Sequence, residues 1–164
     1  MENFSLLSTR YALVFGTQMV FMFIGEYTYS IDEKKRLAVP PKFREQVGKK
    51  AVLTKGLDNC LFLYPEKEWQ SLVEKLSSLP LAQADARGFV RLMLAGGMEV
   101  DLDKTGRILV PDYLKEYAAL NKKVVIAGVL NRIELWDEEK WDTYKKKIER
   151  EVGDIAERLR ELGV

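Results

Sequence analysis

The chain has 164 residues, of which 47% are hydrophobic and 31% are charged, and its net charge is +1. These values are typical of a globular protein and exclude a disordered chain, and the length allows one ordinary domain or two small ones that share a core. The sequence contains no histidine and a single cysteine, which excludes the commonest general base, a cysteine metal site and an internal disulfide.

The chain begins with a segment that differs from the rest. Residues 12–24 form a mostly apolar run after Arg10. This run is shorter than the roughly 20 residues of a membrane span, and no A-x-A-like cleavage site follows it. We therefore expect no membrane segment and interpret residues 1–21 as an N-terminal extension outside the fold, with Met22 as the functional start. A targeting segment is the alternative.

The next elements form a compact unit of strands around one short helix. Alternating aromatic and polar residues predict a strand over 23–31, and a charged turn over 32–35 leads into a second strand. Pro40-Pro41 stops that strand and suits the first turn of a helix. The expected elements are strand 36–39, helix 42–47 and strands 51–55 and 60–64. Cys60 alternates with Phe62 in the last of these, so we expect a buried structural thiol in a reducing compartment.

Helices and a second set of strands follow. Leucines and Trp69 at helical spacing predict a helix over 65–80, and residues 81–95 give another that ends before Gly96-Gly97. The earlier pattern then returns, with strand 98–102, turn 103–106, strand 107–110, short helix 112–118, and strands 123–127 and 132–136. Residues 137–164 form an amphipathic helix with an acidic first turn. Its apolar stripe is too long for a small domain to cover, so we expect part of it to pack against another subunit.

The strongest feature of the sequence is this internal duplication. One extra residue lies in the second copy between the early and late matches. The matched residues are Asp32 with Asp103, Arg36 with Arg107, Val39-Pro40 with Val110-Pro111, Glu45 with Glu116, Gly56 with Gly128, Asn59 with Asn131, Leu63 with Leu135 and Trp69 with Trp141. Residues 31–60 carry a charge of +4 and residues 102–132 a charge of +3, so the remainder carries −6. Two basic units in a nearly neutral chain are consistent with binding of a polyanion, or with ordinary solvated lysines.

Each copy contains one charged turn that could carry function. Lys34, Lys35 and Arg36 in the first turn, and Lys104 and Arg107 in the second, would place cations at a hairpin tip within reach of DNA phosphates or base edges. We expect Asp32 and Asp103 to pair with the arginine four residues on, and Gly106 to take a positive φ angle. Such arginines would keep both carboxylates ionised, which disfavours a catalytic aspartate pair. No phosphate-binding glycine loop, nucleophile with a base, or metal cluster is evident, so we predict no enzyme and no cofactor.

These residues resemble a known family. M-F-I-G-E-Y from Met22, and two D-x-x-x-R turns that are each followed by V-P, are similar to MraZ proteins. The resemblance implies an α+β fold, in which two tandem swapped-hairpin β modules of the AbrB/MazE kind form a pseudo-two-fold barrel with appended helices. The implied segments are a first repeat at 22–80, a helical connection at 81–97, a second repeat at 98–141 and a C-terminal helix at 142–164.

The resemblance also implies a function. MraZ proteins are bacterial transcriptional regulators that bind DNA repeats upstream of the division and cell-wall gene cluster as ring-shaped homo-oligomers. It therefore implies double-stranded DNA as partner, a cytoplasmic, nucleoid-associated location, and DNA contacts at the turn cations named above. Two other interpretations stay open at this stage: an antitoxin-like DNA-binding module with a protein partner, and an enzyme that depends on the two aspartates.

The first turn departs from the family pattern. Lys35 stands where the second turn has Gly106, and a lysine with positive φ costs about 1 kcal/mol. Either the first turn has another shape, or the strain is tolerated and a cation is gained.

Overall fold

The computed structural model describes residues 12–15 and 18–164. From Phe23 onward, strands and helices follow each other in the order that the duplication predicts, and two short strands precede them. They are β1 Ala12–Phe15, β2 Gln18–Phe21, β3 Phe23–Ser30, β4 Arg36–Ala38, α1 Pro41–Val47, β5 Lys50–Lys55, β6 Leu61–Pro65, α2 Glu66–Ser77, α3 Ala84–Ala95, β7 Met98–Asp101, β8 Arg107–Leu109, α4 Asp112–Tyr117, β9 Lys123–Leu130, β10 Arg132–Asp137, α5 Glu138–Leu159 and the 3₁₀ helix η1 Arg160–Leu162.

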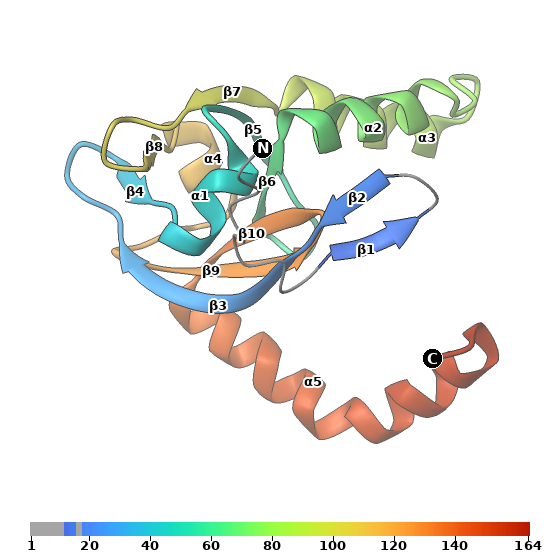
Figure 1. Cartoon of the computed structure of the whole chain (residues 1–164). Coiled ribbons are helices and arrows are strands. Elements are labelled where there is room, and N and C mark those ends of the chain that lie inside the picture. Colours follow the sequence, from blue (N-terminus) through green and yellow to red (C-terminus); the bar gives the residue numbers. More distant parts are fainter. Residues whose placement is uncertain (1–11, 16–17) are drawn as a thin grey trace, which may run out of the picture.

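The strands of the two copies are interleaved. One antiparallel sheet has the order β3-β9-β10-β6-β5-β7, and a two-stranded ribbon joins β4 to β8 (Figure 1). In the pairs β3–β9, β5–β7, β6–β10 and β4–β8, each copy supplies one strand. Neither copy can form this sheet alone. The arrangement confirms the predicted α+β fold of two tandem modules that exchange strands, whereas the pseudo-two-fold barrel stays a prediction, because β3 and β7 are the edge strands of the sheet.

The pseudo-two-fold axis passes through two pairs of matched residues. Leu37 lies opposite Ile108 in the ribbon, and Phe62 lies opposite Glu134 in the sheet. The ribbon ends repeat the symmetry, because the Val39 amide donates to the Gly106 carbonyl (2.9 Å) and the Val110 amide to the Lys35 carbonyl (2.8 Å). The duplication read from the sequence is therefore a physical symmetry of the fold.

The second axis pair joins two different side chains. Glu134 is buried, and its carboxylate accepts hydrogen bonds from Arg132 Nη2 (2.8 Å) and from Trp136 Nε1 (2.9 Å). The Arg132 guanidinium also lies over the Phe62 ring, 4.5 Å from its centroid. A buried carboxylate is stable only when it is paired in this way.

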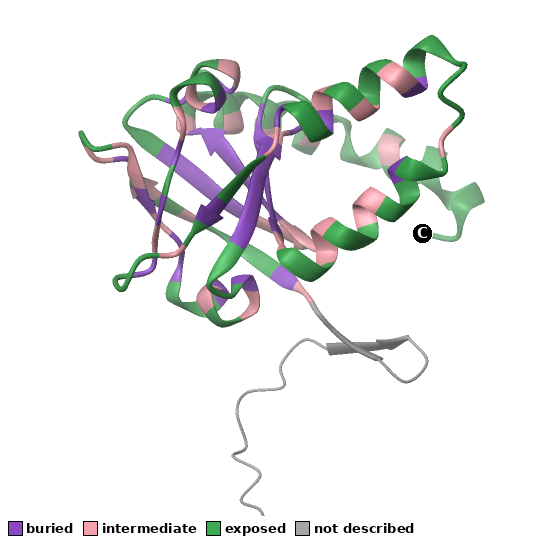
Figure 2. Ribbon diagram, turned by 90° about the horizontal axis from the view of Figure 1, so that it is seen from above, coloured by how far each residue is buried: buried purple, intermediate pink, exposed green. Residues whose placement is uncertain are grey.

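The sheet has an apolar layer on each face, and buried positions concentrate on its strands (Figure 2). Leu61 and Leu63 point into the main core with the ribbon and the short helices α1 and α4, whereas Phe62 and Tyr64 belong to a second cluster. That second cluster includes Leu76 of α2 and Met93 of α3. Cys60 lies there too and is fully buried, as predicted. Successive side chains of β6 thus point into two different cores, which explains why its sequence is almost entirely apolar.

Prolines and glycines set most of the element boundaries. Pro40 and Pro111 stand directly before α1 and α4, where their missing N–H groups cost no helical hydrogen bond. Strand β9 is longer than predicted, because it continues through Gly128 to Leu130. A Cβ atom at Gly128 would lie 2.6 Å from the Ile24 backbone nitrogen. The glycine therefore permits close packing of β9 against β3 and does not end the strand.

The amino-terminal segment contains a hairpin in its described part. β1 and β2 pair with each other in antiparallel register, from Ala12 with Phe21 to Phe15 with Gln18. Residues 1–11 and 16–17 lie outside the described residues, so the prediction for residues 1–21 as a whole stays a prediction. Across the described part of the chain, no helix is both long and apolar enough to cross a membrane.

Within the described residues, the contacts that anchor the last helix lie at its beginning. Asp137 caps α5 by accepting a hydrogen bond from the Lys140 amide, and Trp141 and Tyr144 pack against Trp136 of β10. Glu26 of β3 then accepts hydrogen bonds from Trp141 Nε1 (2.8 Å) and Lys145 Nζ (2.7 Å). Beyond this anchor α5 leads away from the sheet (Figure 1), and its apolar residues Val152 and Leu159, like Leu162 of η1, are exposed.

Candidate nucleic-acid interface

The two charged turns have the same backbone shape. In the first, the Lys35 amide donates to the Asp32 carbonyl at 2.9 Å, and in the second the Gly106 amide donates to the Asp103 carbonyl at 2.9 Å. The fourth residue has a positive φ in both, 62° at Lys35 and 76° at Gly106. Lys35 therefore adopts the conformation of its glycine twin and carries the associated strain. Of the two shapes considered for the first turn, the structure has the strained one.

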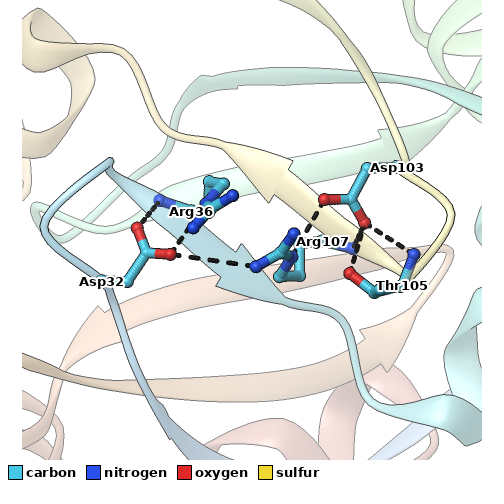
Figure 3. A network of polar contacts seen from close by, with 5 residues as sticks. All are labelled: Asp32, Arg36, Asp103, Thr105 and Arg107. Atoms are coloured by element: carbon cyan, nitrogen blue, oxygen red, sulfur yellow. Dashed lines mark hydrogen bonds and ion pairs between the residues drawn. The ribbon is translucent and has the colours of Figure 1, made fainter.

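Each turn is closed by its aspartate, as Figure 3 shows. Asp32 accepts from the Arg36 amide (2.9 Å) and from Arg36 Nε (2.8 Å). Asp103 accepts from the Arg107 amide (3.0 Å) and Nε (2.9 Å), and also from the amide and hydroxyl of Thr105. Each aspartate binds the Nε atom of its own arginine, so this pairing does not use the two terminal nitrogens of the guanidinium. Such a fixed arginine can donate to a ligand with little loss of side-chain entropy.

These hydrogen bonds shift the acidity of both carboxyl groups. Donation by the Arg36 amide lowers the pKa of Asp32, and donation by the Arg107 amide, together with the Thr105 hydroxyl, lowers the pKa of Asp103 well below its usual range. Both groups are therefore carboxylates at neutral pH. Two ionised aspartates, each bound to an arginine, cannot share a proton as a catalytic pair does.

The interleaved fold places the two turns at opposite ends of the short antiparallel ribbon of β4 and β8, with the arginine of each turn at the start of a ribbon strand. Arg36 begins β4 and Arg107 begins β8, and these strands are paired. Arg107 Nη1 lies 4.0 Å from Asp32 Oδ2, so a carboxylate of one copy faces an arginine of the other (Figure 3). Both arginine side chains are about one third exposed, at 33% and 32%. The structure thus places two fixed guanidinium groups side by side at the surface.

The lysines of the two turns differ in their surroundings. Lys34 and Lys104 are exposed at the turn tips, whereas Lys35 Nζ forms an ion pair with Asp112 Oδ2 at 2.6 Å. Local sequence patterns do not predict this pair, because Asp112 belongs to the other copy. Local patterns likewise do not predict that Arg44 of α1 lies against Gly106 of the second turn. The interleaving of the copies brings these residues together, and the sequence predicted the strand exchange only through the family resemblance and not which side chains would meet.

Other candidate sites have less support in the described part of the chain. No group of three or more His, Cys, Asp or Glu residues there could hold a metal ion. Burial raises the pKa of the Cys60 thiol, and its sulfur donates to the Leu57 carbonyl at 3.1 Å. A buried, protonated thiol is a poor nucleophile.

Comparison with known proteins identifies the family of the chain. The family described as "MraZ protein, putative antitoxin-like" matches the chain twice, at residues 22–92 and 93–161. The chain is 50% identical over 143 residues to "Transcriptional regulator MraZ" of Syntrophomonas wolfei, 51% over 144 residues to the protein of that name from Clostridium tetani, and 52% over 143 residues to that from Caldicellulosiruptor saccharolyticus. Each alignment covers 87% of this chain and 100% of the relative. The resemblance inferred from the paired turns is confirmed, and the chain belongs to the MraZ family.

Proposed function

We propose that this chain is a DNA-binding transcriptional regulator that is not an enzyme and that contacts double-stranded DNA through its two D-x-x-x-R turns. The observation that carries the proposal is the pair of aspartate-held arginines, Arg36 and Arg107, side by side on the ribbon of β4 and β8. The relatives' shared name, transcriptional regulator, supports the same function.

The arginines and the lysines of this surface have different roles in the proposed contact with DNA. A guanidinium with a free edge can donate two parallel hydrogen bonds to a phosphate or to the O6 and N7 atoms of guanine. The exposed ammonium groups of Lys34 and Lys104 suit phosphate contacts, which position the protein without reading sequence. Lys35 contributes less, because Asp112 offsets its charge.

We further propose that several copies act together on repeated promoter elements. The exposed apolar residues of α5 beyond its anchor offer a surface for a neighbouring subunit in a ring-shaped homo-oligomer. A ring would present many turn pairs, so DNA repeats would be bound far more tightly than one repeat alone. The promoter of the division and cell-wall cluster is the proposed target, and the cytoplasmic nucleoid the proposed location. No small-molecule substrate or membrane is part of this function.

The direct test is an electrophoretic mobility shift with DNA from immediately upstream of the chain's own gene. Arg36→Ala and Arg107→Ala should each weaken binding about tenfold or more, because a bidentate contact contributes roughly 1–3 kcal/mol. Arg91→Ala is the matched control, since it removes the same charge from an exposed position on α3, away from the turns. Unchanged affinity of both turn variants would refute the assignment of the turns.

An antitoxin-like role is the second candidate, because the matched family carries that description. In that case the turns would still bind DNA, but the stripe on α5 would hold a different protein. A second polypeptide that co-purifies in fixed proportion with the chain, and is released by substitutions at Val152 and Leu159, would favour this candidate over a homo-oligomer.

A further inference from the structure

A groove runs beside the second turn, between that turn and the carboxyl-terminal end of α1. Four cationic residues line it: Arg44, Lys49, Lys50 and Lys104. The three lysines are exposed, and none of them forms an ion pair within the described residues. The groove therefore continues the basic surface of the second turn.

Three carboxylates also line the groove, but they are fewer than the cations. They are Glu45, Asp101 and Asp103. Asp103 is already bound to Arg107 and Thr105. The lining therefore has a net positive charge, and one of its three carboxylates, Asp103, is already paired within the turn.

Arg44 has a defined position in this groove because Gly106 has no side chain. Arg44 Nε donates to the Val39 carbonyl at 2.8 Å. A Cβ atom at Gly106 would lie 2.2 Å from that same Nε and 2.4 Å from Cζ. The guanidinium therefore occupies the space of the missing side chain. Among the described residues, no acceptor binds its two terminal nitrogens.

The matched position in the other half is different. Lys35 replaces Gly106 there, and Lys115 replaces Arg44. The corresponding groove beside α4 is lined by Lys115 together with Asp112 and Glu116. Asp112 is already paired with Lys35, so Lys115 and Glu116 are left as one cation and one anion in this lining. The pseudo-symmetric fold thus carries one groove whose lining holds four cations and a counterpart whose lining holds one.

We propose that the groove at Arg44 binds a phosphate of the DNA backbone next to the second turn, and that its twin at Lys115 binds none. This inference rests on the proposed function and adds an asymmetry to it. On the side of the second turn, DNA is held by that turn and by the groove that Arg44 of the first copy completes, whereas on the side of the first turn it is held by the turn alone. A body with nearly two-fold symmetry then lies on DNA in one preferred direction.

The test measures DNA affinity as a function of salt concentration for matched variants. Each phosphate contact contributes about 0.9 to the slope of log affinity against log salt. Arg44→Gln should lower the slope by about that amount for each engaged chain, and equally for operator and unrelated DNA. Lys115→Gln, the matched control, should leave the slope unchanged. Lys49→Gln/Lys50→Gln tests the groove without touching the Arg44–Val39 hydrogen bond, and should also lower the slope.

Three results would contradict the inference. If Arg44→Gln and Lys49→Gln/Lys50→Gln keep the wild-type slope while Arg107→Ala loses affinity, the turns bind DNA but the groove does not. If Lys115→Gln lowers the slope as much as Arg44→Gln, the asymmetry is wrong. If the wild-type protein binds no DNA, both this inference and the proposed function fail.

Discussion

Replacement of Gly106 by alanine is a sharp test of the turn geometry. At φ 76° an alanine is strained by about 1–2 kcal/mol. Its Cβ would also displace the Arg44 side chain, and loss of the Arg44–Val39 hydrogen bond costs about 0.5–1.5 kcal/mol. The reduced entropy of the unfolded chain offsets about 0.4–1 kcal/mol. We therefore expect Gly106→Ala to lower the free energy of unfolding by about 2 kcal/mol.

The twin position supplies the control for this substitution. Lys35→Ala keeps a Cβ atom in the same left-handed conformation, so no new strain arises. It removes only the exposed ion pair with Asp112, which contributes about 0.2–1 kcal/mol. Urea unfolding at matched protein concentration should separate the two variants, and thermal unfolding should show a Tm decrease of about 4–8 °C for Gly106→Ala. Wild-type stability of Gly106→Ala, or an equal loss in Lys35→Ala, would refute the reasoning.

Further predictions address the sheet, the last helix and the titration of the turns. Glu134→Ala should destabilise the fold by about 2–3 kcal/mol in urea unfolding, because it leaves the Arg132 cation and the Trp136 N–H without their acceptor, and a loss below 1 kcal/mol would contradict this. Glu26→Ala should speed amide hydrogen exchange over residues 141–147 and leave β10 unchanged, since it removes the anchor of α5; equal exchange in wild type and variant would show that the aromatic contacts suffice. Truncation after residue 147 keeps that anchor, so the body should stay folded while the oligomer mass in light scattering falls, and an unchanged mass would show that the distal helix is not the contact. The folded-state pKa values of Asp32 and Asp103 lie below the ordinary 3.8, so the stability contributed by their pairs is fully present above pH 3.8 and is lost as the pH falls through the lower folded-state value. An NMR titration of both carboxyl groups should show midpoints below 3.8, and a midpoint at or above that value would contradict the hydrogen bonds.

The sequence predicted the order and type of most elements because local signals were strong and occurred twice. V-P before each short helix and the apolar alternation of β6 act within a few residues of their own position. Gly128 shows where such signals mislead, since its role depends on the approach of β3 from far along the chain.

The candidate site was predicted only as far as it is local. Each Asp–Arg pair lies within five residues and followed from the spacing. The contacts of Lys35 with Asp112 and of Arg44 with Gly106 join different copies. Neither periodicity nor charge patterning contains that information, because it arises from strand exchange between the modules.

The mismatch at the second axis pair limits which halves of this protein can combine. If two second halves assembled with each other, Glu134 would face its own copy across the sheet, and two carboxylates would meet at one buried point. If two first halves assembled, Phe62 would face Phe62 without such a penalty. Because one chain links two unlike halves, the favourable combination of Phe62 with Glu134 forms within the molecule. The central position of the second half can therefore hold a buried carboxylate, which a dimer of identical modules could not bury.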